Sequence, residues 1–339
     1  MRGRPIRHRP GGDHPQTEPV SGAGRQLFRD DFRSGFGAGT AWTVLPRGHL
    51  AAGDGVPTCS AGGLTVVPTG VDRRTGHPAF VVTYGPDAPE GGGSDHIKWA
   101  AVARPPDGDD GFAVPPSGAL NCTATVSVES LGAAHHPFGP AVADPDADPR
   151  LATGGLVVTD RKSHLVFDML ATNRLVYAVY ERIRFPGTRY ASFSYAVPVA
   201  TRTPDRWNTF GIRVDHGGTR VTWLVDGEPV LGTDRLGYRA FADDHLVLDH
   251  GGREEPARVS RLTCGIAMVT MLDGAGPDGR GLVRLDPRPD HYFDVARGRP
   301  TPQRFVDERS VPGNRLWGMG EILRLSEFVV TVNDNGSAR

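Results

Sequence analysis

The feature that most constrains this chain is a succession of short β-like segments with no long helical segment between them. In residues 121–131, small and apolar side chains alternate with polar ones, as in an antiparallel strand with one buried face. Similar runs recur as far as residues 322–332, and turn-forming glycine and proline, 45 and 29 of the 339 residues, separate them. No run of 12 or more residues carries a 3.6-residue apolar period. The pattern predicts an all-β fold of packed antiparallel sheets.

We expect one domain over residues 27–333, because strand-like segments begin near Leu27 and continue almost to the C-terminus. All-β sandwiches of this size are common as single domains. Residues 1–26, which are rich in Arg, Pro, Gly and His, are predicted to be a disordered tail, and so are residues 334–339.

The charge balance limits the classes of partner. Lys and Arg total 38 against 39 Asp and Glu, which gives a net charge of −1 and none of the basic excess typical of nucleic-acid binding. No stretch approaches the length of a membrane-spanning helix. Residues 1–25 lack the apolar core of a secretory signal, so we expect a cytoplasmic protein. The expected partner is a small-molecule substrate, with no nucleic acid and no membrane. The oligomeric state does not follow from the sequence.

The strongest local signal is DRWNTFGIRVDHGGTRVTWLVDGEPV, residues 205–230. Trp207, Phe210 and Ile212 are expected to anchor a strand in the core, and the glycine pair 217–218 permits the positive φ of a tight hairpin. The segment resembles the W-x-x-F/Y-x-I strand and V-D-G hairpin of laminarinase-like glycoside hydrolases and laminin-G-type lectin domains. This resemblance implies a concanavalin A-like jelly roll, a sandwich of two curved antiparallel sheets.

Three further motifs extend over the chain: GHPAF (76–80), DHIKW (95–99) and LWGMGE (316–321). With them the chain is also similar to an actinobacterial family of unknown function that shares this sandwich. Because little chemistry is assigned to that family, this resemblance implies a fold and no particular activity.

The resemblance to glucanases does not extend to their catalytic motif. Retaining glucanases of this fold carry E-x-D-x-E or E-x-D-x-x-E on an inner strand, so that alternate carboxylates point into the cleft. The corresponding residues 163–169 read SHLVFDM. If His164, Val166 and Asp168 face inward, one carboxylate remains where the chemistry requires two. Glu181, on the next strand, is a candidate for the second. The chain is therefore not expected to be a typical retaining glucanase.

Polar and aromatic residues gather on the strands expected to form the concave face, and we predict the site among them. Asp168 or Glu181 would act as a base, because carboxylates accept protons from carbon or oxygen acids. Tyr177, Tyr180 or His96 would donate a hydrogen bond to a carbonyl. The predicted substrate-binding residues are His164, Asn173, Arg182, Lys98, Trp99, Trp317, Met319 and Glu321.

The run 95–99 leaves two interpretations open. As a regular strand it would place Asp95, Ile97 and Trp99 on one face and His96 and Lys98 on the other. Lys98, one of two lysines in the chain, could extend along a sheet edge to solvent or could line a pocket.

Three functional hypotheses follow. The first is a cofactor-independent biosynthetic enzyme that acts on an apolar natural-product intermediate of the kind found in antibiotic pathways. It would be a cyclase or isomerase, a class that includes cycloaddition catalysts. Such a cleft would act largely by holding a flexible molecule in a reactive conformation. The second is a carbohydrate-binding or glycoside-hydrolase-like module with a degraded catalytic motif. The third is a non-catalytic interaction protein.

No cofactor or metal site is predicted with a recognised spacing. Gly274, Gly276 and Gly279 match G-x-G-x-x-G, but prolines follow instead of the helix that a dinucleotide site requires. Asp144, Asp146 and Asp148 have a spacing seen in calcium loops, without the distal glutamate. A solvated loop is favoured there, and a structural calcium ion is left open.

Overall fold

A computed structural model describes residues 24–84, 95–185, 187–298 and 302–333 of the chain. The predicted tails 1–26 and 334–339 lie outside the described residues except for residues 24–26. Strand β1 already begins at Arg25, two residues before the expected start of the domain.

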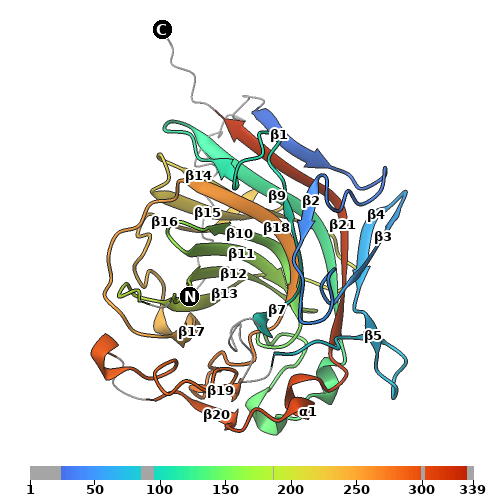
Figure 1. The fold of residues 1–339 in the computed structure, drawn as a ribbon, viewed down its shortest axis with the longest axis vertical. Coiled ribbons are helices and arrows are strands. Elements are labelled where there is room, and N and C mark those ends of the chain that lie inside the picture. Colours follow the sequence, from blue (N-terminus) through green and yellow to red (C-terminus); the bar gives the residue numbers. More distant parts are fainter. Residues whose placement is uncertain (1–23, 85–94, 186, 299–301, 334–339) are drawn as a thin grey trace, which may run out of the picture.

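The first large sheet has eight strands, and its central pair is formed by the long strands β9 (Ala119–Leu131) and β21 (Gly320–Asn333). Strand β1 (Arg25–Asp30) also pairs with β21, so segments from the two ends of the described chain lie side by side (Figure 1). The remaining strands extend the sheet on either side: β14 (Asn208–Asp215), β15 (Arg220–Val225) and β16 (Glu228–Thr233) beyond β9, and β4 (Gly63–Val67) and β3 (Val56–Ser60) beyond β21.

The second large sheet has nine strands and is antiparallel throughout. In spatial order its strands are β17 (Leu246–Asp249), β13 (Phe193–Thr201), β12 (Leu175–Arg182), β11 (Leu165–Ala171), β10 (Thr153–Asp160), β18 (Arg261–Val269), β7 (Ile97–Ala103) and β2 (Trp42–Val44), with β8 (Phe112–Ala113) pairing with β18. Figure 1 shows this sheet curving beneath the first. The predicted jelly-roll sandwich of two curved antiparallel sheets is confirmed.

The elements outside the two sheets are short. They are the paired strands β5 (Gly70–Val71) and β6 (Pro78–Ala79), the parallel pair β19 (Arg280–Val283) and β20 (Arg304–Asp307), the helix α1 (Pro312–Arg315), and 3-10 turns at Ala133–His135, Gly139–Ala141, Asp243–His245 and Val295–Arg297. In the described part of the chain, no helix is long and apolar enough to cross a membrane.

The core between the sheets follows the alternation seen in the sequence. On β9 the side chains of Cys122, Ala124, Val126 and Val128 are buried in it, as expected for one face of that strand. The facing strands of the second sheet contribute large side chains such as Phe167. Burying this apolar surface is the main stabilising contribution to the sandwich.

The segment 205–230 forms the predicted strand and hairpin, with one exception. Phe210 and Ile212 are buried, and Gly217 and Gly218 have positive φ values of 62° and 90°. Trp207 was expected in the core, but it precedes β14 and is 42% exposed. The strand begins one residue later than the motif suggested, so no sheet partner holds Trp207 against the core.

Candidate functional site

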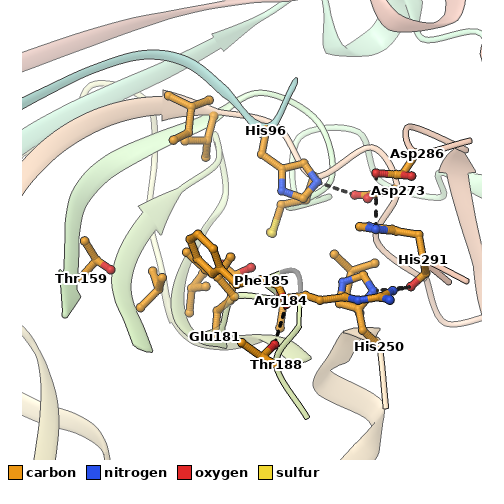
Figure 2. A pocket seen from close by; sticks show the side chains of 18 of the residues that line it. His96, Thr159, Glu181, Arg184, Phe185, Thr188, His250, Asp273, Asp286 and His291 are labelled. Carbon is orange, nitrogen blue, oxygen red and sulfur yellow. Dashed lines mark hydrogen bonds and ion pairs between the residues drawn. The ribbon is translucent and has the colours of Figure 1, made fainter. Parts of the chain in front are cut away.

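A cleft of about 1990 Å³ lies on the face of the second sheet that points away from the core. The strands β10, β11, β12 and β18 form its floor, and residues from segments 183–185, 187–189 and 286–298 line its mouth. Figure 2 shows side chains from the sheet and from these segments pointing toward a common space.

The floor is lined mostly by small aliphatic side chains. Because side chains on a strand alternate between faces, Val166, Asp168 and Leu170 of β11 reach the cleft while Phe167 and Met169 point into the core. The floor also contains Ala100, Val157, Val179, Ala267 and Val269. No tryptophan or tyrosine is among the described residues that line the cleft. This floor suits an apolar ligand, and the aromatic ring of Phe185, which is 44% exposed, borders the cleft at its mouth.

Two carboxyl groups interrupt this apolar floor. Asp168 pairs with Val179 in the sheet, and Glu181 pairs with Val166, so the two acids are diagonal neighbours on one face. Burial raises the pKa of Asp168 well above its usual range, and the charge of Glu181 raises it further. Burial also raises the pKa of Glu181, although His96 and a hydrogen bond from Ser194 offset part of that effect.

Asp168 is hydrogen-bonded to the backbone of the neighbouring strand, whereas Glu181 is bonded to the side chain of Ser194. Asp168 Oδ1 accepts a hydrogen bond of 2.9 Å from the backbone N–H of Val158. The pairing between β10 and β11 is interrupted at Val157 and Val158, so this carboxyl takes up a backbone donor that the sheet leaves unpaired. Asp168 therefore completes the sheet, and Glu181 is the better candidate for a base.

His96 faces the cleft from the residue before β7 and forms a short pair with Asp273. Its Nε2 lies 2.6 Å from Asp273 Oδ1, and the hydroxyl of Tyr292 donates to Asp273 Oδ2 over 2.7 Å. Burial alone would lower the pKa of His96, but the carboxylate of Asp273 and then that of Glu181 raise it to about 9. Burial would likewise raise the pKa of Asp273, and the His96 cation holds it at about 2. At neutral pH this is an imidazolium–carboxylate pair at the edge of an apolar cleft.

Two further histidines lie on the same wall and are neutral at neutral pH. His250 Nδ1 donates to the carbonyl of His291 over 2.8 Å, and the two rings are in edge contact at 4.6 Å between centroids. Burial lowers the pKa of both, and that of His291, beside His250, falls to about 3. Arg288 donates to His291 Nδ1 over 2.9 Å and also pairs with Asp286. His250 and His291 therefore act as polar, uncharged lining groups.

Of the thirteen residues proposed from the sequence, Asp168, Glu181 and His96 line the cleft. Tyr180 does not, because it belongs to the opposite face of β12 and lies in the core, stacked on Phe167. Tyr177 shares the face of Glu181, but Val247 and Met271 cover it and its hydroxyl donates to Ala147 O over 2.6 Å. Neither tyrosine can reach a ligand on the floor.

Lys98 and Trp99 are also placed away from the cleft. A register shift between β18 and β7 breaks the regular alternation of residues 95–99, so Ile97 lines the cleft while Trp99 is buried in the core. Lys98 is buried and binds Asp95 over 2.8 Å and the carbonyl of Val82. Neither interpretation of Lys98 is therefore right: the side chain lies neither at a sheet edge nor in the cleft, but in a buried ion pair with Asp95.

Three other proposed residues hold turns and strand ends together. His164 bonds to the hydroxyl of Tyr190 and stacks on Phe185. Asn173 bonds to the backbone of Ser130, and the Arg182 guanidinium lies 3.9 Å from the centre of the Tyr190 ring. None of the three proposed residues is among those that line the cleft.

The late motif 316–321 contributes to the first sheet and its packing and not to the cleft. Trp317 packs on Phe138, Met319 is buried in the core, and Glu321 lies fully buried on β21. The first sheet covers the core side of the sandwich, so its residues cannot line the opposite face of the second sheet.

The aspartates considered for calcium have protein partners instead of a common centre. Asp144 pairs with Arg174 over 2.8 Å, Asp148 with Arg150 over 2.6 Å, and Asp146 accepts from Asn173. Within the described ranges, no group of three or more His, Cys, Asp or Glu residues could hold a metal ion.

Sequence reasoning missed Asp273 and Tyr292, as well as the pair His250 and His291. Asp273 is 177 residues from His96 and lies in no motif. The two meet because β18 runs beside β7, which brings the residues after β18 next to the residue before β7.

The architecture and the cleft define the class: a jelly-roll sandwich with an acid–base cluster on its concave face. The model of a family of unknown function, DUF6081, matches residues 29–334, and the chain belongs to this family. It is also 27% identical to the uncharacterized protein L829 of Acanthamoeba polyphaga mimivirus, over 44% of this chain and 47% of that protein. The chain thus spans about half the length of that relative.

Solved structures with a similar fold include several glucanases. An endo-1,3-β-glucanase from Streptomyces sioyaensis is 13% identical, with a TM-score of 0.44 over 94% of this chain and 100% of that one. The laminarinase catalytic domain of Thermotoga maritima is 12% identical, with a TM-score of 0.41 over 92% and 99%. At these identities and scores nothing about activity or residue roles is transferred to this chain.

Proposed function

We propose that this protein is a cofactor-independent acid–base enzyme, an isomerase or cyclase, which acts on a largely apolar small molecule bearing a carbonyl group. One observation supports this most directly. A carboxyl group, Glu181, and a histidine–aspartate pair, His96–Asp273, lie together over a floor of small aliphatic side chains (Figure 2).

The proposed chemistry requires a base and an acid on one substrate. Glu181 takes a proton from a carbon next to the carbonyl, while the His96 imidazolium donates a hydrogen bond or its proton to the carbonyl oxygen. If the substrate is a β,γ-unsaturated carbonyl compound, Glu181 returns the proton to the γ-carbon of the dienol. The enol O–H proton goes back to His96, and the product is the α,β-unsaturated isomer. Attack of the enol carbon on a second carbonyl carbon of the same molecule closes a ring. The oxygen of that second carbonyl takes the proton held by Glu181, and the enol O–H proton returns to His96.

The proposed chemistry requires Glu181 to be ionised while His96 is protonated. Glu181 loses its proton at a pKa raised by burial, and His96 keeps its proton up to a pKa of about 9. Between these values the base is a carboxylate and the acid is an imidazolium. Asp273 and Tyr292 orient the His96 ring and stabilise its charge, in the way that a carboxylate supports a catalytic histidine.

The proposal is tested with an apolar ketone, 2-decalone, by following deuterium uptake at the carbons next to its carbonyl in D₂O by mass spectrometry. We expect the native protein to accelerate exchange and Glu181→Gln to lose about 10²-fold or more, because a positioned base contributes about that much. His96→Gln should lose about tenfold or more. Glu129→Gln, the same change on β9 of the first sheet and outside the cleft, serves as the control and should exchange like the native protein.

The pH dependence of the same exchange is a second readout. The rate should fall at low pH as Glu181 is protonated, and at high pH as His96 loses its proton around pH 9. Exchange that is unchanged in a folded Glu181→Gln protein would overturn the proposal.

A glycoside-hydrolase-like function is the second candidate, and the adjacent carboxyls Asp168 and Glu181 favour it. Retaining and inverting hydrolases both use two carboxyl groups facing one cleft. Against it, Asp168 is bonded to the Val158 backbone and its pKa is raised, whereas a nucleophile must be ionised. Release of reducing sugar from β-glucan oligosaccharides, lost in Asp168→Ala, would establish this second function in place of the first.

A further inference from the structure

Two arginines at the mouth of the cleft have no partner among the described residues. Arg189 and Arg253 both line the cleft and are exposed. Their backbones lie side by side, since the N–H of Arg253 donates to the carbonyl of Arg189 over 2.9 Å. No hydrogen bond or ion pair joins either guanidinium to another residue in the described part of the chain.

The other arginines of the same wall are all engaged. Arg184 pairs with Asp290 over 2.8 Å, and Arg288 pairs with Asp286 over 2.6 Å. Arg297 donates to the backbone carbonyls of Thr188, Tyr190 and His250. These three arginines therefore have protein partners. Arg189 and Arg253, in contrast, are two adjacent cations that line the cleft without a partner among the described residues.

Adjacent unpaired cations repel each other, so this arrangement weakens the free protein slightly unless an anion joins them. The arginine fork binds a carboxylate or a phosphate through two parallel hydrogen bonds, which a hydroxyl or an amine cannot match. The apolar lining of the cleft begins beside these arginines. Val179 lies on β12, and Ile183 directly follows that strand.

We propose that Arg189 and Arg253 bind the anionic end of an amphipathic ligand, a carboxylate or phosphate, whose apolar body lies on the aliphatic floor. This inference rests on the proposed function, since it names the class of substrate for the same cleft. It makes the ligand an apolar acid or phosphate ester that carries its reactive carbonyl near Glu181 and His96.

The test compares ligands that share a ten-carbon chain and differ in the head group: decanoate, decyl phosphate, decanol and decyltrimethylammonium. Their binding to the native protein is measured by isothermal titration calorimetry below the micellar range. We expect one of the two anions to bind at least tenfold more tightly than decanol, and the cation to bind most weakly. Preference for decanoate or for decyl phosphate decides between a carboxylate and a phosphate head.

The decisive variant is Arg189→Gln/Arg253→Gln. Both side chains are exposed, so the variant should fold and keep its melting temperature. We expect its affinity for the preferred anion to fall at least tenfold while its affinity for decanol stays the same. Arg33→Gln, at an exposed position outside the cleft, is the matched control and should bind like the native protein. Equal anion binding by the double variant and the native protein would overturn the inference.

The experiment also separates this inference from the proposed function. Glu181→Gln should still bind the anion while it loses deuterium exchange. If anion binding depends on the two arginines but no exchange is catalysed, the ligand class holds and the proposed chemistry fails. If exchange depends on Glu181 but anion binding ignores the arginines, the chemistry holds and the ligand class fails.

Discussion

Glu321 is a carboxyl group buried between the sheets with neither oxygen hydrogen-bonded to a described residue. The positive charge of Arg202 is close enough to affect the pKa of Glu321, but its guanidinium donates hydrogen bonds to the carbonyls of Val128 and Thr172. Burial raises the pKa of Glu321 well above its usual range, and Arg202 offsets part of the shift. The side chain packs so closely on Gly154 that an added Cβ there would meet its Oε1. Burial thus favours the neutral form of Glu321 over the ionised form.

This state predicts a pH-dependent effect of Glu321→Gln on stability. A carboxyl whose pKa is raised on folding favours the native state below its unfolded value and loses that contribution as pH rises through the raised value. Glutamine has no such loss, so the variant should gain stability relative to the native protein between pH 5 and pH 8. Each unit of raised pKa is worth about 1.4 kcal/mol. The measurement is urea denaturation at both pH values, with Glu129→Gln as the control. A variant less stable than the native protein at pH 8 would show that Glu321 is ionised and paired.

At the scale of elements, two turns of similar backbone geometry differ in their surroundings. Gly218, between β14 and β15, has a φ of 90°, and a Cβ there would lie 1.9 Å from the carbonyl oxygen of Val259. Gly227, between β15 and β16, has a φ of 86° and open space around the same position. The first turn is therefore restricted by backbone strain and by packing, and the second by strain alone.

We expect Gly227→Ala to cost about 1 kcal/mol, the strain of an L-residue with positive φ. Gly218→Ala should cost at least about 3 kcal/mol, because a rigid backbone atom must move as well. Guanidinium denaturation of both variants gives the two differences in the free energy of unfolding. Equal losses of unfolding free energy in the two variants would mean that the Val259 backbone moves away from the added Cβ at no measurable energetic cost.

At the scale of the whole molecule, the second sheet separates a packed core from a cleft. Neighbouring residues on β10 differ in their surroundings: Val158 is packed in the core cluster and also borders the cleft, whereas Val157 lines the cleft and lies outside that cluster. The same substitution at these two positions therefore tests which face is which.

Val157→Trp should leave the free energy of unfolding within about 1 kcal/mol of the native value, because the cleft has room for the ring. It should also weaken binding of the preferred ten-carbon anion at least tenfold by filling the floor. Val158→Trp should destabilise by about 3 kcal/mol or unfold the protein, since the core is close-packed. Melting curves and calorimetry on both proteins provide the comparison. Similar stability of the two variants would contradict the assignment of faces.

The local sequence pattern predicts much of the fold but much less of the candidate site. The alternation on β9 and the glycines of the β14–β15 hairpin are local properties, and both appear in the structure as expected. Of the site, Asp168, Glu181 and His96 reach the cleft, but their partners Asp273 and Tyr292 carried no signal. Hydrogen-bonded partners distant in sequence meet through strand order, which local pattern does not contain.

The sequence by itself determined that this chain is a sandwich of antiparallel strands, because period-two alternation and turn residues act within a few positions of each other. Only the tertiary structure decided which residues face the cleft. All seven residues of β11 are buried, because the core covers one face of the second sheet and the cleft walls shield the other. When both faces of a strand are buried, its sequence no longer alternates between apolar and polar residues, so the core face cannot be distinguished from the cleft face. A register shift before Trp99 and the face occupied by Tyr180 therefore placed two expected site residues in the core.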